Sequence, residues 1–245
     1  TAVLNADDAR VLGQRARGPE RVLTFGHSPK AEIRPEAIRF DSEGFFAFRL
    51  CTPLGNVDVR VRGWAETTVV NALAAAGAAV AAGSTLDQIQ TGLNDFTAVP
   101  GRMQCVETRA GTHILDDSYN ANPQSVRNAL ETLARVKSEG RSIAVLGEMG
   151  ELGTEASWAH REIGQFAAET GTDLLFVMGE HAEELARAAI EAGMPRENVS
   201  VCEHHGEIAE AIQATSRPED WILVKGSRSM KMERIVQNLT SQGAG

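Results

Sequence analysis

The stretch HILDDSYNANP, residues 113–123, places a short apolar run directly before a polar turn and the start of a helix. Asn122 is a favoured N-cap residue, and Pro123 suits the first helical position because its missing N–H would have no partner there. The stretch therefore predicts a strand that ends near Leu115 and a helix over residues 123–137. A strand followed by a helix is the repeating unit of α/β domains.

The same order of strand and helix recurs in the residues that follow. The pattern predicts strands at residues 143–146, 174–178, 199–201 and 221–224, and helices at residues 155–170, 181–192, 206–215 and 229–239. Such alternation is typical of a parallel sheet covered on both faces, so we expect a doubly wound, Rossmann-like α/β domain over residues 99–245. Ligands of such sheets bind beyond the carboxyl ends of the strands, which directs attention to the loops after Leu115, Leu146, Met178 and Val224.

Residues 1–98 follow a different pattern and are predicted to form a separate, mixed α/β domain. Strands are indicated at residues 2–4, 21–26, 45–50 and 57–62, and the last of them alternates valine with charged or polar residues. An alanine-rich helix is predicted over residues 67–82, closed by Gly83, and Ser84 can cap a second helix. Pro100 and Gly101 then break the helical pattern, so the domain boundary is placed after residue 98.

The composition argues against several classes of function. The chain is 42% apolar and 23% charged, as in ordinary globular proteins, and its net charge of -9 disfavours a broad surface for nucleic acid or membrane. No apolar run approaches the roughly 18 residues needed to span a bilayer. The cysteines, Cys51, Cys105 and Cys202, form no CxxC pair, so we expect a cytoplasmic protein without a disulfide framework or a cysteine-rich metal site.

Three polar segments follow predicted strands. Residues 116–122 crowd carboxylates, a phenol and amides at a helix N-terminus, which suits a polar or anionic ligand but equally a well-capped turn. Residues 147–153, GEMGELG, let the backbone turn tightly, and a purely structural loop is the favoured interpretation. Residues 225–229, KGSRS, combine cations and hydroxyls, which suits a loop that binds an anion. An ordinary solvent-exposed turn is an equally good interpretation.

The positions of the histidines and lysines argue against a metal site and against a phosphate-binding loop of the GxxxxGK[ST] type. His160 is predicted to face either the site or the core, whereas surface positions are predicted for His27, His181, His204 and His205. No metal site is predicted, because no partners lie at metal-ligand spacing. No lysine follows a glycine, so these residues contain no GxxxxGK[ST] phosphate-binding loop.

Six segments in this order resemble the Mur ligases: NADD (5–8), NALAA (71–75), VPGRM (99–103), DDSYNANP (116–123), GEMGELG (147–153) and KGSR (225–228). The forms of the fourth and fifth are similar to those of the members that add D-alanyl-D-alanine. The resemblance covers essentially all residues. Because the chain starts without Met, on a strand that needs neighbours, we expect it to be the C-terminal fragment of a longer protein.

The resemblance implies an ATP-dependent amide ligase of cytoplasmic peptidoglycan synthesis. Such a ligase phosphorylates the terminal carboxylate of UDP-N-acetylmuramoyl-tripeptide, with Mg²⁺ bridging the phosphates, and the amine of D-alanyl-D-alanine attacks the acyl phosphate. Residues 1–98 are then the later part of the central ATP-binding domain, and residues 99–245 the C-terminal domain. The phosphate-binding loop and a carbamylated lysine are expected before Thr1, so we expect this chain alone to be inactive and assign no catalytic residue.

The resemblance also assigns binding residues by matching position. Asn71 is similar to an asparagine that contacts adenine, and Arg102, Asp117 and Tyr119 to residues that close over the nucleotide. The loops facing the incoming dipeptide carry the remaining assignments: Asn120, Asn122, Glu148, Lys225, Ser227 and Arg228. One departure precedes Asn71, where residues 65–68, AETT, stand in place of the usual Gly-x-His-Asn. Threonine can hydrogen-bond there but cannot act as an imidazole.

Two alternatives stay open at this point. One is another ligase of the same superfamily, such as a folylpolyglutamate or cyanophycin synthetase. The other is a non-catalytic module that binds a nucleotide or peptide. The third residue of the tripeptide, lysine or diaminopimelate, and the oligomeric state are not readable from these residues.

Overall fold

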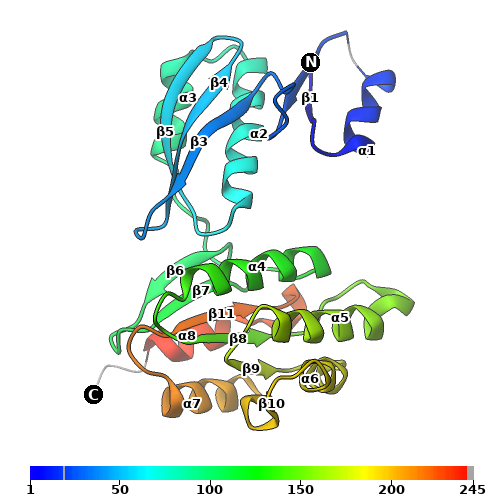
Figure 1. Cartoon of the computed structure of the whole chain (residues 1–245), viewed down its shortest axis with the longest axis vertical. Coiled ribbons are helices and arrows are strands. Elements are labelled where there is room, and N and C mark those ends of the chain that lie inside the picture. The colour runs from blue at the N-terminus through cyan, green and yellow to red at the C-terminus, as the bar shows by residue number, and fades with distance from the viewer. Residues whose placement is uncertain (19, 242–245) are drawn as a thin grey trace. The chain divides into compact units, whose positions relative to one another are not determined.

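A six-stranded sheet forms the centre of the second of the two units into which the chain divides, Thr1–Ala98 and Val99–Gly245 (Figure 1). The computed structural model describes residues 1–18 and 20–241. The strand order is β10-β9-β8-β11-β7-β6. The strands are β6 (Gln104–Glu107), β7 (His113–Asp117), β8 (Ser142–Leu146), β9 (Leu174–Val177), β10 (Val199–Val201) and β11 (Trp221–Lys225). All neighbours are parallel except β6, which pairs antiparallel with β7.

Two groups of helices cover this sheet. The helices are α4 (Pro123–Val136), α5 (Ala156–Glu169), α6 (Ala182–Glu191), α7 (His205–Thr215) and α8 (Glu233–Ser241). Helix α5 packs against both α4 and α6, whereas α7 packs against α8. Right-handed crossovers from β7 through β8 and β9 to β10 place α4, α5 and α6 on one face, and the return to β11 places α7 and α8 on the other. The expected doubly wound α/β fold is confirmed.

The connections make the carboxyl end of β11 a topological switch point. Strand β11 lies between β8 and β7. The chain leaves both of those strands towards the face of α4 and α5, but it leaves β11 towards the face of α8. Connections that diverge in this way open a crevice at the carboxyl edge of the sheet. The residue at this position is Lys225.

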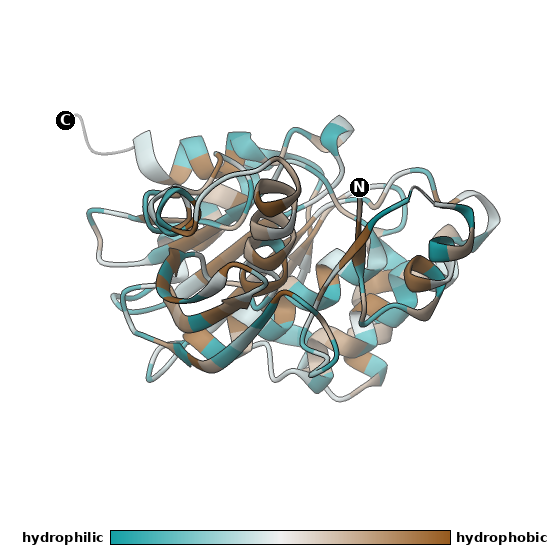
Figure 2. Cartoon of the chain, turned by 90° about the horizontal axis from the view of Figure 1, so that it is seen from above, coloured by the Kyte–Doolittle hydropathy of each residue, from teal (hydrophilic) through white to brown (hydrophobic). Residues whose placement is uncertain are grey.

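The core of this unit forms because alternate strand residues point to opposite faces. On one face, isoleucines and valines of β7, β8 and β11 cluster with Ile208 and Ile212 of α7 and Ile235 of α8. Figure 2 shows brown, apolar residues concentrated on the strands and teal, hydrophilic residues on the outward helix surfaces. Close packing of α5 on α6 requires Gly164, because an added Cβ would lie 2.1 Å from the carbonyl oxygen of Leu185.

The structure corrects several predicted bounds in this unit. Strand β6 was not expected, since Gln104–Glu107 is a half-exposed edge with no apolar run. Strand β7 extends to Asp117, so Asp116 and Asp117 lie on the strand and not in the turn. The helix expected at residues 229–239 is interrupted, because Lys231 adopts a left-handed φ of 51° and separates the 3-10 helix Arg228–Met230 from α8.

In its described residues, 1–18 and 20–98, the first unit contains two small sheets and three α-helices. Strands β1 (Ala2–Asn5) and β2 (Val22–Phe25) pair in parallel, and β3 (Arg34–Phe40), β4 (Phe45–Thr52) and β5 (Gly55–Arg62) form an antiparallel sheet. Helices α2 (Thr67–Ala81) and α3 (Leu86–Asn94) contribute Val69, Leu73 and Ile89 to one core with these strands. The third helix, α1 (Ala9–Leu12), is a single turn.

Two predictions for the first unit need correction. Strand β3 was not predicted, because Pro35 interrupts its pattern and a bulge lies between Glu36 and Arg39. The N-cap of α3 is Thr85 and not Ser84. The Thr85 hydroxyl accepts a hydrogen bond from the backbone N–H of Gln88, and the Gln88 side-chain oxygen accepts one from the backbone N–H of Thr85.

Within residues 1–18 and 20–241, no helix is both long and apolar enough to cross a membrane. The three cysteines are free, and Cys51 and Cys202 are buried. Burial raises the pKa of both thiols, which keeps them protonated and unreactive.

Candidate functional site

A buried ion pair lies at the switch point. Lys225 and Asp117 end neighbouring parallel strands in direct register. The Lys225 Nζ lies 2.5 Å from Asp117 Oδ2 and donates a second hydrogen bond, of 2.9 Å, to the carbonyl oxygen of Asn120. The lysine side chain is only 3% exposed, so its charge needs both partners. The pair joins the KGSRS segment to the polar turn after β7.

Asp117 also holds the segment that precedes β6. Its Oδ1 accepts the N–H of Met103 at 3.1 Å, so both carboxylate oxygens have a donor. Burial raises the pKa of Asp117 above its ordinary value, and the charge of Lys225 and the hydrogen bonds from Lys225 and Met103 only partly oppose this. The carboxylate is therefore held in place but incompletely stabilised, as is common at functional sites.

The polar turn itself is partly structural. Asp116 accepts the N–H of Ser118 at 3.1 Å, and both side chains are buried. Asn122 caps α4: its Oδ1 accepts the N–H of Ser125 at 2.9 Å, while the Ser125 hydroxyl accepts the Asn122 N–H. The side chain of Asn122 is thus engaged by the helix, whereas Asn120 is exposed. The predicted N-cap and the first helical position of Pro123 are confirmed.

An exposed cation and ring lie above the buried pair. The guanidinium carbon of Arg102 lies 3.9 Å from the centre of the Tyr119 ring, and the N–H of Tyr119 donates to the carbonyl of Gly101. The Tyr119 side chain is 47% exposed. A flat, solvent-facing cation and ring can stack on the base or ribose of a nucleotide.

The glycine loop after β8 packs against the segment after β11. The N–H of Gly147 donates to the carbonyl of Lys225, and the N–H of Ser227 donates to the carbonyl of Glu148. An added Cβ at Gly147 would lie 2.8 Å from the sulfur of Met232, so a side chain there would require the buried Met232 to shift. Residues 147–150 and 225–228 therefore form one surface at the edge of the sheet.

The residues assigned to nucleotide and dipeptide binding by resemblance do not all lie in the same unit. The second unit brings together Arg102, Asp117, Tyr119, Asn120, Asn122, Lys225, Ser227 and Arg228. Arg228 is 60% exposed and pairs with Glu233 at 2.9 Å, while Ser227 is buried and hydrogen-bonds to Ser229. Asn71 is an exposed residue of α2 in the first unit. The N-cap position of α2 is Glu66, whose side chain makes no capping hydrogen bond. Glu66 lies in the segment AETT, where the sequence departs from the Mur ligase pattern.

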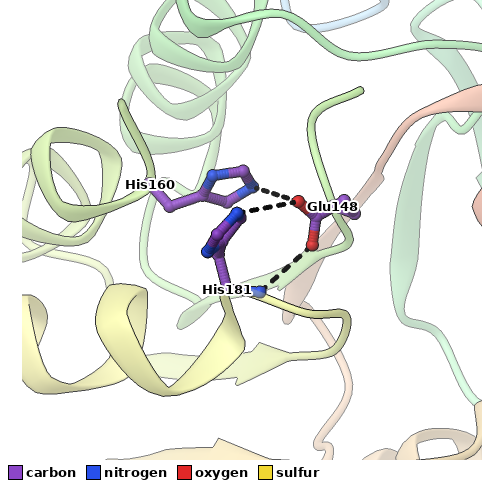
Figure 3. A group of neighbouring side chains, drawn as sticks. All are labelled: Glu148, His160 and His181. Atoms are coloured by element: carbon purple, nitrogen blue, oxygen red, sulfur yellow. Dashed lines mark hydrogen bonds and ion pairs between the residues drawn. The ribbon is translucent and has the colours of Figure 1, made fainter. Parts of the chain in front are cut away.

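Glu148 turns towards two histidines (Figure 3). Its Oε1 lies 3.5 Å from His160 Nε2 and 3.9 Å from His181 Nε2. The prediction of a surface position for His181 is wrong, because its side chain is 19% exposed and its ring centre lies 4.9 Å from that of His160. His160 is buried, in agreement with one of its two predicted positions. No spacing in the sequence links the three residues, because they follow two different strands.

The arrangement is suited to binding an anion beside a nucleotide. The edge of the sheet offers the N-terminus of α4 and the exposed positive charge of Arg228. Both Asp117 oxygens already have donors, so this carboxylate does not fit the role of a Mg²⁺ ligand. Within the described residues, we assign no Mg²⁺ ligand at this edge.

Comparison with known protein families and curated sequences identifies relatives. Residues 101–228 match the family model of the Mur ligase glutamate ligase domain. The chain is 33% identical over 249 residues to UDP-N-acetylmuramoyl-tripeptide–D-alanyl-D-alanine ligase of Escherichia coli K12, an alignment covering 99% of this chain and 52% of that protein. It is 30% identical to the ligase of the same name from Mycobacterium tuberculosis CDC 1551, covering 98% and 50%. The chain thus spans about half the length of these relatives.

Solved structures share the fold. MurF from Acinetobacter baumannii superimposes with a TM-score of 0.84 at 27% identity, covering 98% of this chain and 52% of that one. MurF from Thermotoga maritima, solved with ADP, gives 0.82 at 24% identity, covering 98% and 53%. Folylpolyglutamate synthase from Thermotoga maritima gives 0.62 at 15% identity, covering 96% and 53%.

Proposed function

Because the chain belongs to the Mur ligase family, we propose that it supplies the nucleotide-closing and dipeptide-facing part of an ATP-dependent amide ligase. The ligase joins D-alanyl-D-alanine to UDP-N-acetylmuramoyl-tripeptide in the cytoplasm, during synthesis of peptidoglycan precursors. The observation that carries the proposal is the similarity to ligases of this name along almost the whole chain, at a level well above that to other members of the fold.

The residues divide the work between a nucleotide side and a dipeptide side. Arg102 and Tyr119 stack on the nucleotide, Asn71 contacts its adenine, and Asp117 holds both Lys225 and the Arg102–Met103 backbone in position. On this proposal Asp117 positions the site, because both of its oxygens are engaged within the protein. ATP supplies the phosphoryl group that activates the tripeptide carboxylate.

On the dipeptide side, the turn of residues 225–228 and the loop after β8 form the binding surface. Arg228 is exposed, and its partner Glu233 can release it to pair with the carboxylate of D-alanyl-D-alanine. The exposed amide of Asn120 supplies a further polar contact. These residues orient the dipeptide amine towards the activated carboxylate, which is the main contribution a protein makes to such a transfer. Residues 1–98 act as part of the ATP-binding domain.

The decisive experiment measures ADP release from a protein that combines these residues with a GxxxxGK[ST] loop. We expect release to require UDP-N-acetylmuramoyl-tripeptide and D-alanyl-D-alanine together. Turnover with L-glutamate and a folate in place of these substrates would favour the folylpolyglutamate alternative. Tight binding of ATP or dipeptide in calorimetry, with no ADP release, would favour a non-catalytic module. We expect the 245 residues alone to give no turnover, since they lack that loop.

A further inference from the structure

Glu148 forms a cluster with His160 and His181, two residues that have no role in the proposed ligase reaction. Glu148 follows β8, His160 lies in the early part of α5, and His181 precedes α6 (Figure 3). One ligand atom from each residue lies within 4.8 Å of the others. The side chains are 17%, 2% and 19% exposed, respectively, so the cluster is shielded but still accessible from one side.

The distances match those of a metal-ligand set. Ligands about 2.0–2.1 Å from a tetrahedral Zn²⁺ lie roughly 3.4 Å from one another. The Oε1 of Glu148 is 3.5 Å from His160 Nε2 and 3.9 Å from His181 Nε2. All three ligand atoms lie within 4.8 Å of one another, so rotations of the Glu148 and His181 side chains can bring them closer to a common ion. Glu148 and His181 lie outside the helices and strands, whereas His160 is held within α5.

The hydrogen bonds fix which ring nitrogen of His160 is free to bind. Its Nδ1 lies 2.7 Å from the carbonyl oxygen of Ala156, which can only accept, so Nδ1 carries the proton. The lone pair is therefore on Nε2, where it accepts the N–H of Met149 at 3.0 Å. This arrangement, with the far nitrogen donating to a carbonyl, is the one that metal-binding histidines adopt. An ion on Nε2 would replace the Met149 bond.

His181 and Glu148 are oriented in a similar way. The Nδ1 of His181 lies on the side of the Glu184 carboxylate, at 3.9 Å, so its Nε2 is directed towards Glu148. The other oxygen of Glu148, Oε2, accepts the N–H of His181 at 3.2 Å, which leaves Oε1 facing both imidazoles. The Glu148 side chain is thus directed towards the two histidines.

We propose that Glu148, His160 and His181 bind a divalent transition-metal ion, such as Zn²⁺, with water at the remaining coordination position. Two imidazoles and one carboxylate suit Zn²⁺, whereas Mg²⁺ requires oxygen ligands in an octahedron. The site is therefore distinct from the Mg²⁺ that accompanies ATP. The ion joins the loop after β8 to α5 and α6, and it stabilises the loop whose Glu148 carbonyl accepts from Ser227.

The test uses the 245-residue chain, stripped of metal with a chelator and titrated with Zn²⁺ by calorimetry. We expect one ion per chain, with Mg²⁺ in excess failing to compete. His181→Ala and Glu148→Gln should each weaken binding by more than about 10-fold, and Glu184→Gln by about 10-fold. His204→Ala is the matched control, since it removes an exposed histidine outside the cluster. Binding that is absent, or that all variants retain, would overturn the proposal.

Two measurements on the unaltered chain keep the test independent of variant folding. Substitution with Co²⁺ should give the intense visible absorption of a four-coordinate ion, and the spectrum of aqueous Co²⁺ would overturn the site. In an amide NMR spectrum, Zn²⁺ should shift the Met149 resonance, because its hydrogen bond to His160 is lost. An unshifted Met149 resonance at saturating Zn²⁺ would also overturn it. Neither readout depends on ligase activity, so the proposed function can fail without affecting this result.

Discussion

Strand β11 has a buried ion pair at each end, and the two pairs differ in how completely their carboxylates are satisfied. At the amino end, Asp220 lies 2.6 Å from the Arg141 guanidinium, with its side chain 2% exposed. At the carboxyl end, Lys225 lies 2.5 Å from Asp117. Asp220 accepts from the backbone N–H groups of Arg141 and Arg217 and from two side-chain nitrogens of Arg141. Asp117 accepts hydrogen bonds from the Lys225 ammonium and the backbone N–H of Met103.

The difference appears in the direction of the two pKa shifts. Burial acts to raise the pKa of Asp220, but the hydrogen bonds from Arg141 and Arg217 outweigh it, so this pKa is lowered. For Asp117 burial is not outweighed, and the pKa is raised. The amino end of the sheet is therefore a satisfied part of the framework. At the carboxyl end the cost of burying the Asp117 charge is not fully offset, as is common at functional sites.

The largest expected effect comes from breaking the framework pair. Asp220→Ala leaves two backbone N–H groups without their acceptor and the Arg141 guanidinium, 26% exposed, without its counter-ion. We expect the free energy of unfolding to fall by about 3–5 kcal/mol, measured by urea denaturation. Glu191→Ala is the control, because its pair with Arg161 is about half exposed and should contribute less than about 1 kcal/mol. Equal losses in both variants would refute the framework role.

The carboxyl-end pair should be less costly to break. Lys225→Met removes the counter-ion of Asp117, but that carboxyl already has a raised pKa and can take up a proton. We expect a loss of about 2–3 kcal/mol near neutral pH, below that of Asp220→Ala. Adding Asp117→Asn to this variant removes the unpaired charge and should return stability to within about 1 kcal/mol of the parent chain. A double variant no more stable than Lys225→Met would contradict the argument.

The two ends should also respond to pH with opposite sign. The lowered pKa of Asp220 contributes stability above the unfolded value of 3.8, which is lost as pH falls through the lower folded pKa. The raised pKa of Asp117 contributes stability below 3.8, which is lost as pH rises through the higher folded pKa. Relative to the parent chain, Asp117→Asn should gain stability with rising pH and Asp220→Asn should lose it. Denaturation series across this acidic range check both slopes, and slopes of the same sign would be inconsistent with the comparison.

The smallest effect on stability is expected at the exposed part of the carboxyl end. Tyr119→Ala removes a ring that is 47% exposed and its contact with Arg102, so stability should change by less than about 1 kcal/mol. Tyr119→Phe retains the ring and should match the parent chain. In a protein with the phosphate-binding loop, the alanine variant should weaken nucleotide affinity while the phenylalanine variant does not. A large loss of stability in Tyr119→Ala would show that the ring supports the fold.

Local patterns allowed the strands and helices of the second unit to be predicted, because apolar runs and helix caps act over a few residues. The cap at Asn122 and the buried strands at 143–146 and 221–224 are examples. Elements without a local signal were missed. Strand β6 is positioned by its pairing with β7 and by the packing of Val106 on the core, and the left-handed turn at Lys231 precedes Met232, which packs against Gly147 and Gly226.

By itself, the sequence determined the α/β class, the alternation of strands and helices and the motifs that resemble the Mur ligases. The tertiary structure decided which loops meet. Inserting β11 between β7 and β8 brings Lys225 to Asp117 across 108 residues, and the neighbouring ends of β8 and β9 bring Glu148 to His160 and His181. Strand order is set by the burial of whole helix and sheet faces, which no short stretch of sequence encodes.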